Sequence, residues 1–399
     1  MTGPPVAEGA VLIDGQGTIV AVGRRTDLLQ RHPGAPEERG AGALLPGLVN
    51  AHCHLELSAL AERVSGHDGL VSWVGRLMAA TAAEAETATT ASDRRAAAAH
   101  RAAIQMAAAG TAAIGDVGNS LDAVTAVADA GLRGVVFHEL VGSRDARTGD
   151  ALADAARELD RVADRWPPGV GYVVAPHAPY SAGPDLIRRI FAAAKRAGVP
   201  TSVHVAEDED EIALLRDGSG RWPAVLEAMG VAAGSRVPGL TPVAYLASLG
   251  AFDADAPPLL VHMVHAGAED RRIAAAAGAT AVVCARSNLH IGDRLPDVPA
   301  LLADGVRLAL GTDSLASSPD LSLWGELTTL ARAFPTVPST TWLAAATRAG
   351  ADAMRLPALG ALAPGRRPGV IDVSLGDPAR PAEALVRDPR PIVRWLVRP

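Results

Sequence analysis

Short apolar runs alternate with longer alanine-rich runs through the middle of the chain. The short runs are rich in residues that favour strands, and their length is typical of buried strands. The longer runs repeat their apolar residues with helical spacing, most clearly at residues 150–166, 185–198 and 269–278. The predicted strands cover residues 47–55, 111–117, 134–140, 171–177, 201–206, 259–265, 280–285 and 306–312.

Eight alternations of strand and helix predict an α/β fold, a closed (β/α)8 TIM-like barrel. In such a barrel the catalytic groups lie at the carboxyl ends of the strands. An open, doubly wound sheet is the alternative. However, no glycine-rich phosphate loop follows the first predicted strand, and such a loop is typical of that fold.

Both ends of the chain carry a different pattern, in which apolar and polar residues alternate. Residues 6–42 alternate around an Asp-Gly-Gln-Gly turn, which predicts a β-hairpin. Similar segments return near the C-terminus. We therefore expect residues 1–43 and 360–399 to build one small β-sandwich domain beside a barrel of residues 44–359.

The composition excludes several classes of partner. With 37 basic and 44 acidic residues, the formal net charge is -7, whereas a protein that binds nucleic acid normally carries a basic stripe. No stretch of about 18 apolar residues could span a bilayer, and the N-terminus lacks a signal-peptide pattern. We expect a cytoplasmic protein that binds a small molecule, with Cys53 and Cys284 as free thiols.

Two histidines stand at the end of the first predicted strand. His52 and His54 are two residues apart, so their side chains point to the same side of a strand while Cys53 points to the other. Two neutral imidazoles on a rigid strand form half of a site for a divalent metal ion. The same pair could also be core or surface histidines, so the metal hypothesis depends on partners further along the chain.

Three later strands end in residues that supply such partners. His204, His262 and Asp313 stand at the ends of the fifth, sixth and eighth predicted strands, and in a barrel these ends converge on one mouth. Taken alone, His204 could be a core histidine and Asp313 a helix N-cap. The only lysine, Lys195, lies in the last turn of a helical run, which makes a lysine carbamate between two metal ions implausible.

Together these residues resemble the amidohydrolase superfamily, specifically the aminohydrolase branch that deaminates purines, pterins and triazine-like rings. The resemblance covers nearly the whole chain. Residues 54–58, His-Leu-Glu-Leu-Ser, are also similar to the deaminases of aminodeoxyfutalosine, an adenine nucleoside that carries a benzoate. The motifs that carry the resemblance are residues 46–54, the His204-X-X-Glu207 pair, His262, Ser287-Asn288 and residues 311–313.

The resemblance implies a site with one divalent metal ion, Zn²⁺ or Fe²⁺, that activates a water molecule. Glu207 would protonate the ring of the substrate, because a shielded carboxyl can hold a proton at neutral pH. Asp313 would move a proton from the water to the leaving ammonia, and His262 would stabilise the developing charge. The metal ligands that the resemblance implies are His52, His54, His204 and Asp313.

Substrate recognition would fall to residues around the mouth of the barrel. Glu56 could meet a ribose hydroxyl or a ring edge, His177 could contact the sugar, and Asn288 could orient a neighbouring ligand or the ring. A substrate carboxylate would call for an arginine near a strand end. The candidates are Arg144, Arg147 and Arg286.

The expected activity is hydrolytic deamination of an adenine nucleoside, namely 6-amino-6-deoxyfutalosine to 6-deoxyfutalosine and ammonia in menaquinone biosynthesis. The same site would suit a deaminase of adenosine, methylthioadenosine or S-adenosylhomocysteine, or a triazine-type hydrolase, because these reactions differ in the pocket lining. An alternative of another class is a non-catalytic barrel that acts as a binding module. Family members are often homodimers, although no segment here requires this.

Overall fold

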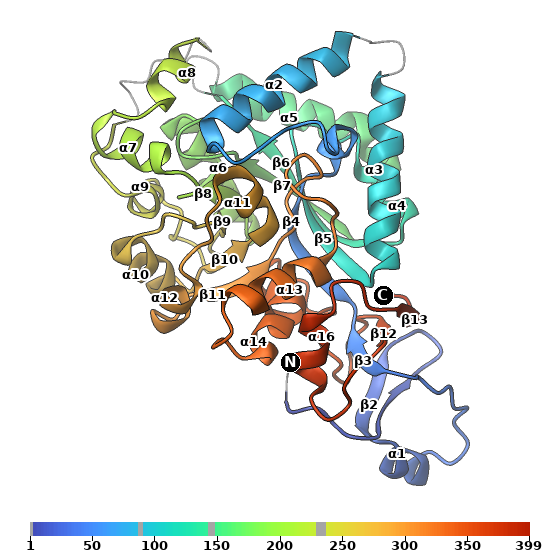
Figure 1. Cartoon of the computed structure of the whole chain (residues 1–399). Coiled ribbons are helices and arrows are strands. Elements are labelled where there is room, and N and C mark those ends of the chain that lie inside the picture. Colours follow the sequence, from blue (N-terminus) through green and yellow to red (C-terminus); the bar gives the residue numbers. More distant parts are fainter. Residues whose placement is uncertain (1–2, 87–90, 143–147, 229–236) are drawn as a thin grey trace.

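Within the described residues 3–86, 91–142, 148–228 and 237–399, the computed structural model contains eight parallel strands around a common axis (Figure 1). Each observed strand overlaps the range predicted for it. The strands are β4 (Leu48–Cys53), β5 (Thr111–Gly118), β6 (Arg133–Leu140), β7 (Val170–Pro176), β8 (Ser202–Val205), β9 (Leu259–His262), β10 (Thr280–Val283) and β11 (Arg307–Leu310).

The strands form two parallel sheets, in the orders β4-β5-β6-β7 and β8-β9-β10-β11, which meet at two seams. At one seam, the backbone N–H of His204 donates to the carbonyl oxygen of His177 at 2.9 Å. At the other, the N–H of Thr312 donates to the carbonyl oxygen of His52, also at 2.9 Å. The predicted closed (β/α)8 barrel is therefore confirmed, and the alternative of an open sheet is wrong.

Apolar side chains cover both faces of the barrel strands. On the outer face, Leu48, Leu260 and Leu310 belong to a core cluster that includes the surrounding helices. Burial on both faces explains why these strands are continuous apolar runs in the sequence. A second cluster combines small and medium side chains from strands of both sheets, among them Val49, Ala113, Phe137, Ala175, Val261, Val282 and Ala309.

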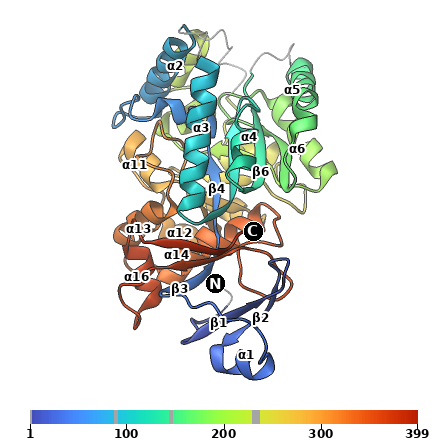
Figure 2. The ribbon, with the colours of Figure 1, turned by 90° about the vertical axis from the view of Figure 1, so that its right-hand side faces the viewer.

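Helices surround the barrel, and α2 crosses the end towards which β4 runs (Figures 1 and 2). Helices α5, α6 and α10 confirm the three helical runs that are clearest in the sequence. No helix in the described part of the chain is long and apolar enough to span a membrane. The helices are α2 (Leu70–Glu86), α3 (Ala91–Ala108), α4 (Val124–Asp129), α5 (Thr148–Val162), α6 (Pro184–Ala197), α7 (Glu209–Asp217), α8 (Trp222–Ala228), α9 (Pro242–Ser248), α10 (Ala268–Ala276), α11 (Ala285–Gly292), α12 (Val298–Ala303), α13 (Leu323–Ala333), α14 (Ser339–Ala344) and α15 (Gly350–Ala353).

The terminal segments form two antiparallel sheets at the end of the barrel opposite α2 (Figure 1). One sheet is the predicted hairpin of β1 and β2, and the other has the order β13-β12-β3. The elements are β1 (Gly9–Ile13), β2 (Ile19–Arg24), α1 (Arg25–Arg31), β3 (Ala43–Pro46), β12 (Val370–Val373), α16 (Pro381–Arg387) and β13 (Val393–Val397).

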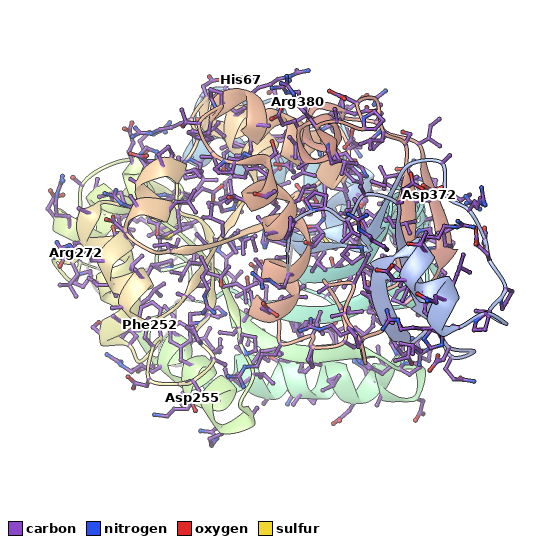
Figure 3. The ribbon with its side chains drawn as sticks, turned by 90° about the horizontal axis from the view of Figure 1, so that it is seen from below. His67, Phe252, Asp255, Arg272, Asp372 and Arg380 are labelled. Atoms are coloured by element: carbon purple, nitrogen blue, oxygen red, sulfur yellow. The ribbon has the colours of Figure 1, made fainter. Side chains whose placement is uncertain are left out.

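Hydrogen bonds tie the N-terminal segment to the C-terminal one. The carboxylate of Asp372, labelled in Figure 3, accepts the backbone N–H groups of Ala41 at 3.0 Å and Gly42 at 2.9 Å. The N–H of Ile19 donates to the carbonyl oxygen of Arg366 at 2.9 Å. The two termini therefore lie together as expected, while the domain boundaries after residues 43 and 359 stay a prediction.

Candidate active site

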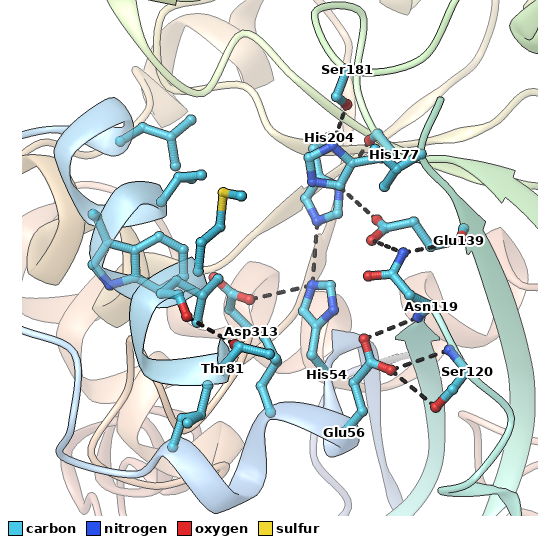
Figure 4. A pocket seen from close by; sticks show the side chains of 18 of the residues that line it. His54, Glu56, Thr81, Asn119, Ser120, Glu139, His177, Ser181, His204 and Asp313 are labelled. Atoms are coloured by element: carbon cyan, nitrogen blue, oxygen red, sulfur yellow. Dashed lines mark hydrogen bonds and ion pairs between the residues drawn. The ribbon is translucent and has the colours of Figure 1, made fainter. Parts of the chain in front are cut away.

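The imidazoles of His52, His54 and His204 meet at the carboxyl ends of β4 and β8. His54 and His204 are labelled in Figure 4. The Nε2 atoms of His54 and His204 lie 3.3 Å apart, and the ring centroid of His52 lies 4.8 Å and 4.9 Å from those of His54 and His204. Oδ1 of Asp313 lies 3.5 Å from Nε2 of His54 and 3.9 Å from Nε2 of His52. The four residues predicted to be metal ligands therefore lie together.

The spacing and chemistry of these atoms fit one divalent ion. Nitrogen ligands about 2.0 Å from a tetrahedral ion lie about 3.3 Å from one another, which matches the 3.3 Å between His54 and His204. Both ring nitrogens of His52 are buried and have no hydrogen-bond partner among the described residues, as expected where the partner is an ion. Burial, and then the neighbouring imidazoles, hold the pKa values of His52 and His204 well below the usual range, so both rings are neutral and can bind a metal.

Neighbouring groups select the atom of each ligand that faces the centre of the site. Nδ1 of His204 lies 2.9 Å from the carbonyl oxygen of His177 and donates to it, which leaves Nε2 free. The hydroxyl of Ser287 donates to Oδ2 of Asp313, and that of Ser317 donates to the same atom at 3.2 Å. Oδ1 of Asp313 is thereby left to face the imidazoles.

Two of the strand-end residues have a left-handed backbone. The φ angle is 75° at His262 and 58° at Asp313, values that residues other than glycine rarely adopt and that are concentrated at functional sites. Gly311 allows the end of β11 to approach β4, because a Cβ atom at this position would lie 2.8 Å from the Cβ of His52. The direction of these side chains therefore depends on local backbone geometry as well as on strand alternation.

Glu207, His262 and Asn288 form a second group beside the imidazoles. Nδ2 of Asn288 donates to Nδ1 of His262 at 2.9 Å, so the proton of the neutral ring is on Nε2, which lies 3.4 Å from Oε1 of Glu207. Burial, and then the charge of Asp313, raise the pKa of Glu207 well above its usual value. Glu207 can therefore keep a proton at neutral pH, while Asn288 orients His262.

A buried glutamate that the sequence analysis did not identify lies next to the imidazoles. Oε1 of Glu139, at the end of β6, is 3.3 Å from Nδ1 of His204, and Oε2 accepts a hydrogen bond from Nδ2 of Asn119 at 3.2 Å. Burial, and then the charge of Glu56, raise the pKa of Glu139 well above the usual range. The available signal was the placement of Glu139 at the carboxyl end of the third barrel strand, where functional groups gather.

Glu56 and His177 face the same cavity. The carboxylate of Glu56 accepts the backbone N–H groups of Asn119 at 3.0 Å and Ser120 at 3.2 Å (Figure 4). Nδ1 of His177 is hydrogen-bonded to the hydroxyl of Ser181. Burial, and then the imidazoles of the site, lower the pKa of His177 to about 3, so this ring is neutral and can contact a substrate only as a hydrogen-bonding group.

Arg286, one of the three arginine candidates for a substrate carboxylate, is engaged by other groups of the protein. Its guanidinium donates to Oε1 of Glu326 at 2.7 Å, to Oδ1 of Asp320 at 2.8 Å and to two backbone carbonyl oxygens. Arg286 does not line the cavity described below. Its charge is used inside the protein, between β10 and α13. The other two candidates, Arg144 and Arg147, lie outside the described residues.

Replacing Arg286 with glutamine should therefore reduce stability and leave substrate affinity unchanged. The side chain of Glu326 is fully buried, and breaking a buried ion pair typically costs about 3–5 kcal/mol. Urea unfolding of the variant measures the loss, and the double variant Arg286→Gln/Glu326→Gln should recover part of it. Unchanged unfolding together with a raised KM would restore the original assignment.

A cavity of about 800 Å³ lies over these residues. This volume falls within the range of sites that enclose small organic ligands. Helix α2 supplies an apolar wall with Leu70, Trp73, Val74, Leu77 and Met78. The polar groups at the strand ends that line the cavity are His54, Glu56, Glu139, His177, His204, Glu207, His262 and Asp313.

Comparisons with known proteins agree on the family. The description Amidohydrolase family matches residues 43–392. The chain is 31% identical over 361 residues to an aminodeoxyfutalosine deaminase of Deinococcus radiodurans, covering 86% of this chain and 80% of that protein. It is 33% identical over 333 residues to a 5-methylthioadenosine/S-adenosylhomocysteine deaminase of Halobacterium salinarum, covering 81% and 68%. The solved structure of Helicobacter pylori aminofutalosine deaminase with methylthio-coformycin has a TM-score of 0.82 at 21% identity, covering 96% of this chain and 91% of that one.

The chain belongs to the amidohydrolase family. It is a hydrolase that acts on C–N bonds, and its histidine cluster has the ligand atoms to hold a metal ion. The alternative of a non-catalytic barrel is therefore wrong. The role of each side chain in the reaction stays a prediction.

Proposed function

We propose that this protein is a metal-dependent deaminase that hydrolyses the 6-amino group of an adenine nucleoside, with 6-amino-6-deoxyfutalosine as its substrate. The observation that carries this proposal is Glu207, a buried carboxyl with a raised pKa that lies 3.4 Å from His262, in the cavity that also holds the imidazoles and Asp313. The two deaminases described above, which are similar to this chain, support the choice of an adenine nucleoside.

His52, His54, His204 and Asp313 would hold one divalent ion, for which Zn²⁺ and Fe²⁺ both suit the nitrogen and oxygen donors. When bound, such an ion lowers the pKa of water from 15.7 towards about 7, which supplies a nucleophile near neutral pH. The neutral state of the buried imidazoles is the state that this role needs.

The proton transfers fall to side chains of this chain. Glu207 donates its proton to the ring nitrogen next to the carbon that bears the amine, because burial keeps the carboxyl protonated until the ring accepts it. Asp313 accepts a proton from the attacking water and delivers it to the amine, which leaves as ammonia. His262 carries its ring proton on Nε2 and donates a hydrogen bond to the attacking oxygen. One water molecule is consumed. As the attacking oxygen becomes the oxo group of the ring, its remaining proton returns to the carboxylate of Glu207.

We assign recognition of the sugar to the wall formed by Glu56, Glu139 and His177. Oε1 of Glu139 has no hydrogen-bond donor among the described residues, and the carboxylate of Glu56 has lone pairs beyond the N–H groups that it accepts. Two carboxyl groups on one wall suit a pair of neighbouring hydroxyls, which donate two hydrogen bonds. A ribose supplies such a pair.

A panel of nucleosides tests the proposed substrate. We expect the benzoate-bearing adenine nucleoside to give the highest kcat/KM, at least about tenfold above adenosine, 5′-methylthioadenosine and S-adenosylhomocysteine, because the pocket lining discriminates among shared chemistry. Release of ammonia and loss of the adenine absorbance measure each reaction. Failure of every member of the panel to release ammonia would refute deamination of adenine nucleosides.

Deamination of 5′-methylthioadenosine is the second candidate. The relative from Halobacterium salinarum and the apolar wall of α2, with Trp73 and Leu77, favour it, because a methylthio group prefers an apolar surface. A higher kcat/KM for this nucleoside than for the benzoate-bearing one would select the second candidate.

A further inference from the structure

One side chain in the described lining of the cavity carries a fixed positive charge. Arg95, in the first turns of α3, is the only arginine or lysine that lines the cavity among the described residues. It comes from α3, whereas the imidazoles come from the strand ends. The other ionisable side chains of the described lining, besides the histidines and Tyr180, are the carboxyl groups of Glu56, Glu84, Asp122, Glu139, Glu207 and Asp313.

Arg95 is available to a ligand. Within residues 3–86, 91–142, 148–228 and 237–399, no hydrogen bond or ion pair engages its guanidinium. Two other arginines, by contrast, are bound to a carboxylate of the protein. Arg63 forms an ion pair with Glu84, and Arg94 pairs with the same carboxylate at 3.1 Å. These two pairs also neutralise Glu84, so the carboxylate at this wall does not cancel the charge of Arg95.

The surroundings of Arg95 suit an apolar group that ends in an anion. Ala96 and Ala99 follow on the same helix, and Trp73, Val74 and Leu77 face the cavity from α2. Binding of a flat or aliphatic group against such surfaces is favourable, because apolar area is removed from water. At this wall, away from the strand ends, Arg95 is the cation among the described lining residues that would attract a negatively charged end.

We propose that Arg95 binds a carboxylate at the distal end of the substrate. The inference rests on the proposed deamination of an adenine nucleoside and narrows its substrate class to nucleosides whose 5′ extension is apolar and ends in a carboxylate. The guanidinium can meet a carboxylate with two parallel N–H donors. Arg95 was not among the candidates for this role in the sequence, which were Arg144, Arg147 and Arg286, and it determines specificity without contacting the reacting atoms.

Replacing Arg95 with glutamine in the metal-loaded enzyme tests this assignment. The kcat/KM for an adenine nucleoside whose 5′ extension ends in benzoate should fall about 10-fold to 100-fold, the size of a hydrogen bond to a charged group. The loss should be mainly in KM. The kcat/KM for 5′-methylthioadenosine, which has no carboxylate, should stay unchanged and reports that the variant is folded. Arg95→Lys keeps the charge but not the paired donors. Its kcat/KM for the benzoate-bearing nucleoside should therefore lie between those of the wild type and Arg95→Gln.

Arg101 provides the matched control. It lies on the same helix, is exposed, and lines a separate surface depression instead of the cavity, so Arg101→Gln should change neither reaction.

Equal losses of Arg95→Gln on both nucleosides, or no loss on either, would overturn the role of Arg95 while the deaminase function stands. A wild-type enzyme that deaminates only 5′-methylthioadenosine would overturn the carboxylate class. A wild-type enzyme that releases ammonia from neither would refute the proposed function itself.

Discussion

Replacing Glu207 with glutamine should reduce turnover by about 10²-fold to 10⁴-fold, the typical contribution of a general acid. Glutamine has nearly the same shape and can still donate a hydrogen bond, but it cannot transfer a proton to the substrate ring. The side chain of Glu207 is only 8% exposed, so bulk water cannot readily replace it as the acid. Steady-state release of ammonia measures kcat, and the loss should appear in kcat more than in KM.

The bound metal separates this role from a structural one. Glu207 is not one of the residues whose ligand atoms converge. Glu207→Gln should therefore keep the metal content of the wild type. Glu209, an exposed residue of the same acidic run, gives the matched control, and Glu209→Gln should retain full activity. Near-normal turnover of Glu207→Gln, or a loss that follows a loss of metal, would remove Glu207 from its assigned role.

The barrel could be predicted from the sequence because its strands are buried on both faces. Such strands give continuous apolar runs, and their regular alternation with helices leaves few other topologies. Barrel closure then fixes where the strand ends lie, so His204 and Asp313 could be assigned to one site with His52 despite their separation in the sequence. For the same reason, Glu139 was predictable in principle, since it ends a barrel strand as His204 does.

The partners of long side chains could not be predicted in this way. Arg286 stands near a strand end in the sequence, but its guanidinium forms ion pairs with Glu326 and Asp320. Arg95 lies in a helix that sequence analysis had no reason to select, because its role depends on how α2 and α3 enclose the cavity. The backbone angles of the site could not be predicted either, because the left-handed geometry at His262 occurs at a residue that is not glycine.

Removing the divalent ion should abolish turnover and lower the thermal stability of the protein. Activation of water by such an ion contributes several kcal/mol, and each 1.36 kcal/mol is a factor of ten in rate, so we expect a loss of about 10³-fold or more. A ligand that binds only the folded state stabilises it by about 2.7 kcal/mol at 100 times its Kd. Dialysis against a chelator, followed by ammonia assays and thermal unfolding, measures both effects.

Reconstitution then identifies the ion and tests the ligand set. Because neither ring nitrogen of His52 has a hydrogen-bond partner among the described residues, removing the ion should leave a buried polar group unsatisfied, which is costly. Zn²⁺ or Fe²⁺ added to about one equivalent should restore activity and melting temperature together. His265, a partly exposed histidine outside the ligand cluster, gives the control, since His265→Gln should bind the ion normally while His52→Gln should not. Full turnover with less than about a tenth of an equivalent of metal would contradict the assignment, because only a hydrolysis that needs no ion would survive complete removal.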